Sequence, residues 1–139
     1  MLKKLLLAAV PVLATSQALA LDAQQWSALE PAVKAAVECS KPLTAEMLKD
    51  VPTDSPGAWT LTPPTAFNVL GLPVTRVEVF IDPNEELGAI YTAVIEKQSL
   101  KKVEQQVKAA SKKGLIGDLA AGQAHGPEQV EITCVVAEG

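Results

Sequence analysis

The chain is poor in the residues on which most enzymes depend. Its 139 residues include a single histidine, His125, and only two cysteines. It contains no Gly-x-Ser-x-Gly nucleophile motif, no His-Glu-x-x-His metal motif and no glycine-rich motif for phosphates or dinucleotides. These absences argue against the common hydrolase, metalloprotease and nucleotide-binding classes. We therefore predict a protein that is not an enzyme and that holds neither a cofactor nor a metal.

Aromatic residues are also scarce, with two Trp, two Phe and one Tyr. A core built from this sequence must consist mainly of Val, Leu, Ile and Ala. No internal repeat is visible, and the 119 residues from Leu21 to Gly139 fit one domain of ordinary size.

The longest apolar run, residues 5–14, is too short for a transmembrane helix, which needs about 20 residues. Lys3 and Lys4 precede it, and the small-residue motif Ala18-Leu19-Ala20 follows it. This order of charged start, apolar run and small-residue site is typical of a secretory signal peptide. We predict that residues 1–20 are cleaved off after Ala20, leaving a periplasmic or secreted protein without a transmembrane anchor.

Basic residues are in the minority. Without residues 1–20 the chain keeps ten Lys and Arg against sixteen Asp and Glu, a formal charge of −6. The one local excess of positive charge lies on a single predicted helix and consists of Lys101, Lys102, Lys108, Lys112 and Lys113. Because nucleic acids are bound through clustered basic residues, we do not expect a nucleic acid partner.

The two cysteines favour a disulfide, since their number is even and the predicted compartment is oxidising. Cys39 lies near the end of the first predicted helix and Cys134 lies in the last predicted strand, so a Cys39–Cys134 bond would join the two ends of the domain. The alternative is a pair of free thiols, but the chain has no Cys-x-x-Cys motif and no histidine near either cysteine.

Two segments have the apolar spacing of helices. The first follows a capping residue, Asp22, and repeats apolar residues from Trp26 to Val37. Pro31 lies inside this segment, where a proline removes a backbone hydrogen bond and kinks a helix. Ser27-Ala-Leu-Glu30 resembles a capping box, so the regular helix could instead begin again there. The second helix is predicted to begin after Ser99 and to end near Gly114.

A β-hairpin within Leu70–Glu96 is the strongest strand pattern. In its first arm Val77, Val79 and Ile81 alternate with Arg76, Glu78 and Phe80, and Ala89–Glu96 forms its second arm. Further strands are predicted at an edge and at the end of the chain, whereas a Gly- and Ala-rich segment is predicted to be a loop. These segments are Ala58–Thr62 (edge), Thr65–Leu70 (short strand), Leu115–Pro127 (loop) and Gln129–Val136 (final strand).

The order helix, short strands, hairpin, helix, strand does not alternate as a parallel α/β sheet would. It predicts an α+β fold with a mostly antiparallel sheet of four or five strands and two helices packed on one face. We assign one domain to residues 21–139.

The acidic turn of the hairpin, Asp82–Gly88, begins like a calcium-binding loop. The EF-hand pattern requires Gly at its sixth position and an acidic residue at its twelfth, but Leu87 and Ala93 stand there. We interpret the segment as an ordinary acidic turn.

These observations lead to two functional hypotheses. The first is a small exported binding or accessory protein of the bacterial envelope, such as an inhibitor, immunity or interaction module. Its predicted contact surface is Arg76, Glu78 and Phe80, and its expected partner is another envelope or secreted protein. The pattern leaves open whether a helix covers Phe80.

The alternative is a small periplasmic enzyme or ligand carrier using the loop 114–127 with Asp118 and His125 as an acid/base pair. No nucleophile is indicated beside them, so an exposed loop histidine is the simpler interpretation. No motif in the chain is distinctive enough to name a family.

Overall fold

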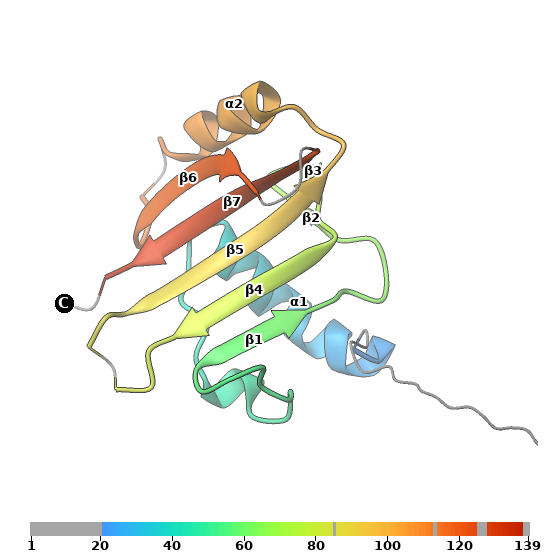
Figure 1. Cartoon of the computed structure of the whole chain (residues 1–139), viewed down its shortest axis with the longest axis vertical. Helices are drawn as coiled ribbons and strands as arrows, with labels where there is room; N and C mark the ends of the chain where they lie inside the picture. The colour runs from blue at the N-terminus through green and yellow to red at the C-terminus, as the bar shows by residue number, and fades with distance from the viewer. Residues whose placement is uncertain (1–20, 85, 113, 125–127, 138–139) are drawn as a thin grey trace, which may run out of the picture.

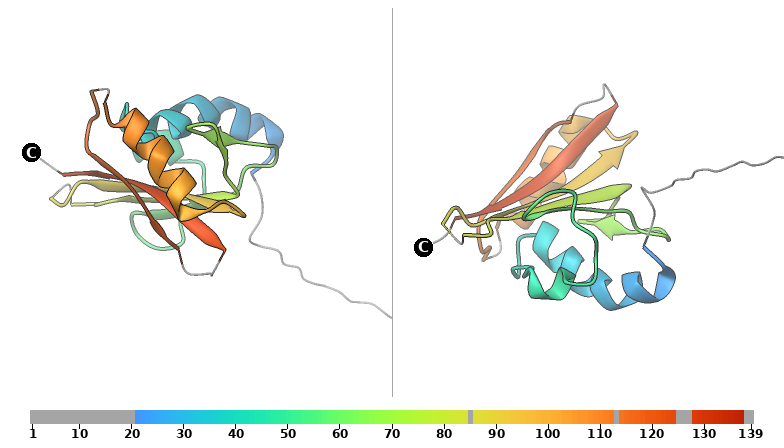
Figure 2. Two further views of the ribbon diagram at one scale, coloured as in Figure 1. Left: turned by 90° about the horizontal axis from the view of Figure 1, so that it is seen from above. Right: turned by 60° about the horizontal axis from the view of Figure 1, so that its bottom comes forward.

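The computed structural model describes residues 21–84, 86–112, 114–124 and 128–137. Five antiparallel strands form one sheet in the order β1-β4-β5-β7-β6, and two α-helices cover the same face of it (Figures 1 and 2). The strands are β1 Ala58–Leu61, β4 Arg76–Ile81, β5 Ala89–Glu96, β6 Asp118–Gln123 and β7 Gln129–Val136; the helices are α1 Ala23–Val37 and α2 Leu100–Ala110. A short 3-10 helix, η2 Glu46–Leu48, and a two-stranded sheet of β2 Asn68–Val69 and β3 Leu72–Pro73 complete the fold. The predicted α+β architecture is confirmed.

Helix α1 begins as predicted, because the Asp22 side chain accepts a hydrogen bond of 2.8 Å from the backbone N–H of Gln25. Pro31 lies inside one continuous helix, so the proposed second start at residues 27–30 is not observed. The buried residues of α1 are Trp26, Val33, Ala36 and Val37, which fall on one helical face.

The C-terminal end of α1 turns sharply at Cys39, which has a positive φ of 65°. The backbone N–H groups of Cys39 and Ser40 donate to the carbonyl oxygens of Ala36 and Ala35, respectively. This is the Schellman arrangement, in which glycine usually occupies the left-handed position. A cysteine there costs about 1–2 kcal/mol relative to a right-handed conformation, and the turn directs the chain back towards the sheet.

The inner face of the sheet, towards the helices, is apolar and largely covered. Most of the alternating residues of β1, β4, β5 and β7 that point this way are buried: Trp59, Leu61, Val77, Val79, Tyr91, Ala93, Ile95, Val130, Ile132 and Cys134. Val103 and Val107 of α2 belong to the same core as the buried residues of α1. The alternation predicted for the first hairpin arm is therefore observed, with Val77 and Val79 inside and Arg76, Glu78 and Phe80 on the other face.

The segment Leu115–Pro127 was predicted to be a loop, and this prediction is wrong, because it contains β6. Leu119 pairs with Cys134 and Ala121 with Ile132, so both side chains lie on the inner face and pack against the core beside α2. The prediction failed because Gly and Ala have low strand propensity, whereas this strand is stabilised by pairing with β7 and by partial burial.

The outer edge of the sheet at β1 is closed by its own flanking segments. The N–H of Ala58 donates to the carbonyl of Ser55, and its carbonyl accepts from the N–H of Asp54. Further along, the carbonyl of Thr62 accepts from the N–H of Leu21. The outward backbone groups of Ala58 and the carbonyl of Thr62 are therefore unavailable to another strand. β1 was predicted to be an edge strand, and the sheet order confirms this.

Residues 1–20, on which the signal-peptide prediction rests, lie outside the described residues. Within the part of the chain that the structure describes, neither α-helix combines the length and the apolar character that spanning a bilayer requires.

Candidate functional sites

Cys39 and Cys134 form the predicted disulfide, with an S–S distance of 2.01 Å and a Cα–Cα distance of 5.4 Å. The bond joins the turn after α1 to the inner face of β7, and both residues are fully buried. It therefore ties the helical cover directly to the sheet and leaves no thiol available for chemistry.

The outer face of the sheet is the first candidate site. No helix among the described residues covers it, and its side chains form rows across the strands. One row consists of directly paired neighbours that are mainly apolar, which we call the outer row: Ala58, Phe80, Ile90, Val135 and Asp118. Ile90 is 39% exposed and Val135 is 40% exposed, although both lie on inner strands of the sheet, near one end of the β5–β7 ladder. The outer row is thus an apolar strip open to solvent.

The next row on this face is mainly polar. It lies two residues further along each strand and consists of Thr60, Glu78, Thr92, Thr133 and Ala120. Arg76 Nε donates to Glu78 Oε2 at 2.9 Å, with side-chain exposures of 32% and 44%, respectively. The predicted surface residues Arg76, Glu78 and Phe80 therefore lie together on an open face. Arg76 and Glu78 form an ion pair with each other.

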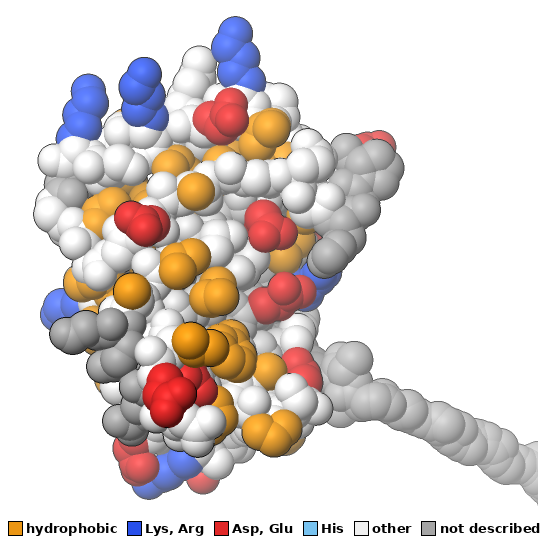
Figure 3. Space-filling model, turned by 60° about the vertical axis from the view of Figure 1, so that its left-hand side comes forward, with side chains coloured by type: hydrophobic (Ala, Val, Ile, Leu, Met, Phe, Trp, Pro, Cys, Tyr) orange, Lys and Arg blue, Asp and Glu red, His pale blue; other side chains and the backbone are white. Residues whose placement is uncertain are grey.

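The charge around this face is predominantly acidic. Figure 3 shows a group of hydrophobic side chains bordered by Asp and Glu, whereas Lys side chains gather at the top of the view, over α2. A shallow hollow of about 320 Å³ adjoins the outer row and is bordered by Asp54 and Glu78. A partner that fits this face would be apolar at its centre and basic at its margin.

The hairpin turn after β4 uses Asp82 as a structural acceptor. Its Oδ2 accepts from the N–H groups of Leu87 and Glu86 at 2.7 and 2.9 Å, and its Oδ1 accepts from Asn84 at 3.1 Å. These donors, Leu87 foremost, hold the pKa of the Asp82 carboxyl below its ordinary value. Within the described residues, no group of three or more His, Cys, Asp or Glu is arranged to hold a metal ion.

Only one member of the alternative acid/base pair, Asp118, lies within the described residues. Asp118 is the first residue of β6 and is exposed, at one end of the outer row. His125 comes after the end of β6 and lies outside the described residues. Within the loop 114–127 on which this alternative rests, Asp118–Gln123 form strand β6.

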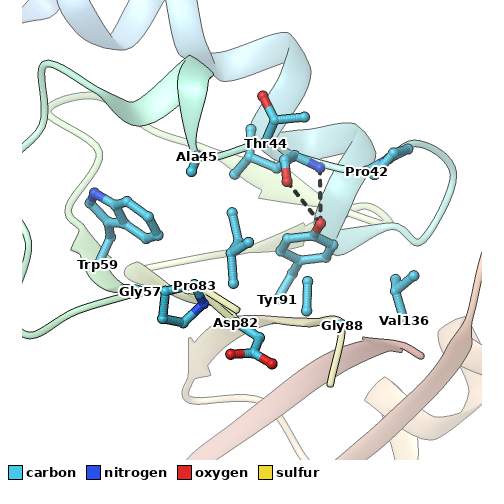
Figure 4. A pocket seen from close by; sticks show the side chains of 13 residues that line it. Pro42, Thr44, Ala45, Gly57, Trp59, Asp82, Pro83, Gly88, Tyr91 and Val136 are labelled. Atoms are coloured by element: carbon cyan, nitrogen blue, oxygen red, sulfur yellow. Dashed lines mark hydrogen bonds between the residues drawn. The ribbon is translucent and has the colours of Figure 1, made fainter. Parts of the chain in front are cut away.

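A second hollow, of about 470 Å³, lies at the inner side of the sheet, near the hairpin turn (Figure 4). Its sheet wall includes Ala89, Tyr91 and Val136, and residues 42–45 form the opposite wall. The complete lining is Pro42, Leu43, Thr44, Ala45, Gly57, Trp59, Ile81, Asp82, Pro83, Gly88, Ala89, Tyr91 and Val136. We call this the Tyr91 hollow.

Tyr91 is the central residue of this hollow and is 1% exposed. Its hydroxyl donates to the carbonyl of Leu43 and accepts from the N–H of the same residue, both at 3.0 Å (Figure 4). Burial raises the pKa of this hydroxyl above its ordinary value, while the bond to Leu43 works against the rise. The hydroxyl is therefore neutral at physiological pH, and its two hydrogen bonds attach Leu43 to the sheet.

The sequence pattern predicts Phe80 of the outer row as a surface residue, but it predicts neither the extension of this row to Ile90 and Val135 nor the Tyr91 hollow. The available signal for the hollow was the placement of Tyr91 with Ala93 and Ile95 on one side of the second hairpin arm. The partner of Tyr91 is Leu43, 48 residues away in the chain, and no local pattern connects them.

No protein-family model matches the chain, and no match was found among curated proteins or among solved structures.

Proposed function

We propose that this chain is a small exported binding or accessory protein of the bacterial envelope, an inhibitor, immunity or other interaction module without catalytic activity. It contacts another envelope or secreted protein through the outer face of its sheet. The observation that carries this proposal is the outer row, in which Phe80, Ile90 and Val135 present a continuous apolar strip to solvent across three paired strands. Contiguous exposed apolar strips of this kind mark interaction surfaces.

The setting of the outer row supports a protein partner. Interfaces combine an apolar centre with a polar rim, and here the rim consists of threonines and carboxylates with the Arg76–Glu78 pair. A rigid, disulfide-linked scaffold behind this face lowers the conformational cost of binding, because the strands are already ordered. The acidic border favours a partner with basic residues around its own apolar patch.

The test compares the oxidised wild-type protein with a Phe80→Ala, Ile90→Ala double variant. Tagged protein is incubated with envelope extract, a recovered partner is purified, and its dissociation constant is then measured for each variant. We expect the double variant to bind at least about tenfold more weakly, because central apolar contacts dominate interface energies. Arg76→Ala should have a smaller effect, since its charge is already paired.

A Lys101→Ala, Lys108→Ala variant is the matched control, because both lysines are exposed on α2, away from the outer face. Thermal unfolding checks that every variant is folded. Equal affinity of the wild type and the Phe80→Ala, Ile90→Ala variant would exclude the outer row as the contact surface.

A further inference from the structure

Two segments that line the Tyr91 hollow, residues 42–45 and the Asp82 turn, are each fixed in place by their own set of bonds. On one side, residues 42–45 are fixed to the sheet by the Tyr91 hydroxyl at Leu43 and by the disulfide at Cys39. Cys134 pairs directly with Tyr91 across β5 and β7, so both attachments act on adjacent strands. The Tyr91 side chain keeps this segment at a fixed distance from the sheet.

The Asp82 turn, which also lines the hollow, is equally constrained. The Asp82 turn is held by three backbone N–H donors, and Gly57 packs against its start. A Cβ added to Gly57 would lie 2.5 Å from the carbonyl oxygen of Ile81 and 2.9 Å from Pro83 Cδ, so the backbones touch without room for a side chain. Because neither wall can move inward without breaking these contacts, the hollow is pre-formed.

The polar groups of the lining side chains are largely engaged within the protein. The Trp59 indole N–H donates to the carbonyl of Val51 at 3.3 Å. The Tyr91 hydroxyl is paired on both sides, and three backbone donors surround the Asp82 carboxylate. The side chains therefore offer ring and aliphatic surface to a ligand, and no Lys, Arg or His lines the described hollow.

Thr44 is the remaining polar side chain of the lining and is exposed. Its hydroxyl oxygen accepts from the N–H of Met47 at 3.3 Å, and Figure 4 shows the side chain directed away from Tyr91 and Asp82. A ligand in the hollow would therefore make mainly apolar contacts, with Tyr91 and Trp59 among them.

We propose that the Tyr91 hollow is a binding site for a small neutral apolar molecule, of the size of two or three fused or linked rings. Its volume of about 470 Å³ lies within the usual range for small-molecule pockets, about 300–1,000 Å³, and such pockets are mainly apolar and pre-formed. Anionic molecules are disfavoured, because the lining holds a carboxylate and no cationic side chain. The site faces the helices and the outer row faces away from them, so the two proposals are independent.

The test uses two fluorescent probes with related ring systems, the neutral N-phenyl-1-naphthylamine and the anionic 8-anilino-1-naphthalenesulfonate. Each is titrated into the oxidised wild-type protein, and amide chemical shifts are recorded at saturation. We expect saturable binding of the neutral probe, at least tenfold weaker binding of the anion, and shifts concentrated at residues 42–45 and 88–91. Absence of saturable binding, or equal affinity for the two probes, would overturn the proposal.

Ala45→Leu narrows the mouth from an exposed position in the lining and should weaken binding of the neutral probe at least tenfold. Ala66→Leu is the matched control, because Ala66 is also exposed but is not part of the lining. If Ala45→Leu leaves the affinity unchanged while Phe80→Ala lowers it, the probe binds the outer row and the site is wrongly assigned. Thermal unfolding of Ala45→Leu confirms the fold, and the wild-type chemical shifts locate the probe independently of any variant.

Discussion

The two faces of the sheet are built from the same strands but differ in composition and exposure. On β7, Ile132 and Cys134 point inward and are 0% exposed, whereas Val135, their near neighbour, points outward and is 40% exposed. The inner face is covered by α1 and α2 and tied to its cover by a disulfide. The outer face carries threonines and charges, yet it keeps an apolar strip where Phe80, Ile90 and Val135 meet.

This difference separates residues needed for the fold from residues available for a partner. Apolar side chains on the inner face gain stability by leaving water, at about 25 cal/mol per Å² of buried apolar surface. Those of the outer row remain partly in water in the isolated protein, so burying them on binding yields the same kind of gain. Substitutions on the two faces should therefore report on different properties, stability on the inner side and association on the outer side.

The largest expected effect on stability comes from removing the disulfide that joins the turn after α1 to the inner face of β7. A Cys39→Ser, Cys134→Ser variant opens a loop of 95 residues and should lose about 4–5 kcal/mol of unfolding free energy in the chain-entropy model. Urea unfolding of the variant and of the oxidised wild type measures the difference. Reduced wild-type protein is the control and should behave like the variant. A loss below about 1 kcal/mol would show that the helices hold to the sheet without the disulfide.

A pair of substitutions in one strand tests the two faces directly. Ile132→Ala removes a fully buried side chain and should cost about 2–5 kcal/mol. Val135→Ala, three residues along β7, should cost less than about 1 kcal/mol, because its side chain is already 40% exposed. Denaturant midpoints of both variants give the comparison. Equal losses would mean that the outer face is buried in the free protein, for example in a self-associated form.

The smallest expected effect concerns Asp82 in the hairpin turn between β4 and β5. Backbone donors from Leu87, Asn84 and Glu86 lower the pKa of Asp82 in the folded protein, so its contribution to stability is present above the unfolded pKa of about 3.9. That contribution is lost as pH falls through the lower folded pKa.

Asp82→Asn should therefore lower the melting temperature by a few degrees at pH 7 and by less at acidic pH. Melting curves between neutral and acidic pH measure this change, with Asp50→Asn as a control at an exposed loop position. A difference between Asp82→Asn and wild type that stays constant across this range would contradict the assignment.

The sequence predicted those parts of the fold that depend on local patterns. Asp22 and Ser99 marked the helix starts, alternation marked β4, β5 and β7, and the parity of the cysteines indicated their bond. Strand β6 was missed because its stability comes from β7 rather than from its own residues. Strand β2, placed in a longer predicted segment, pairs only with β3 in a separate small sheet.

The candidate sites were less predictable than the fold. Alternation placed Arg76, Glu78 and Phe80 on one face, but it could not show that the helices leave that face open or that Ile90 and Val135 extend it. The Tyr91 hollow depends on the contact of Tyr91 with Leu43 and on the approach of Gly57 to Ile81. Both contacts join distant segments, so they appear only after the chain has folded.

The position of β7 in the sheet has a consequence for the timing of folding during synthesis. Central strand β5 has β4 on one side and β7 on the other, and 95 positions separate Cys39 from Cys134 in β7. A growing chain that already carries the β4–β5 hairpin but not yet β7 therefore has one long strand edge unpaired and Cys39 without its partner. Because such pairings between distant segments form slowly and leave strand edges open, the chain is most exposed to aggregation in this interval, which ends only when β7 is available.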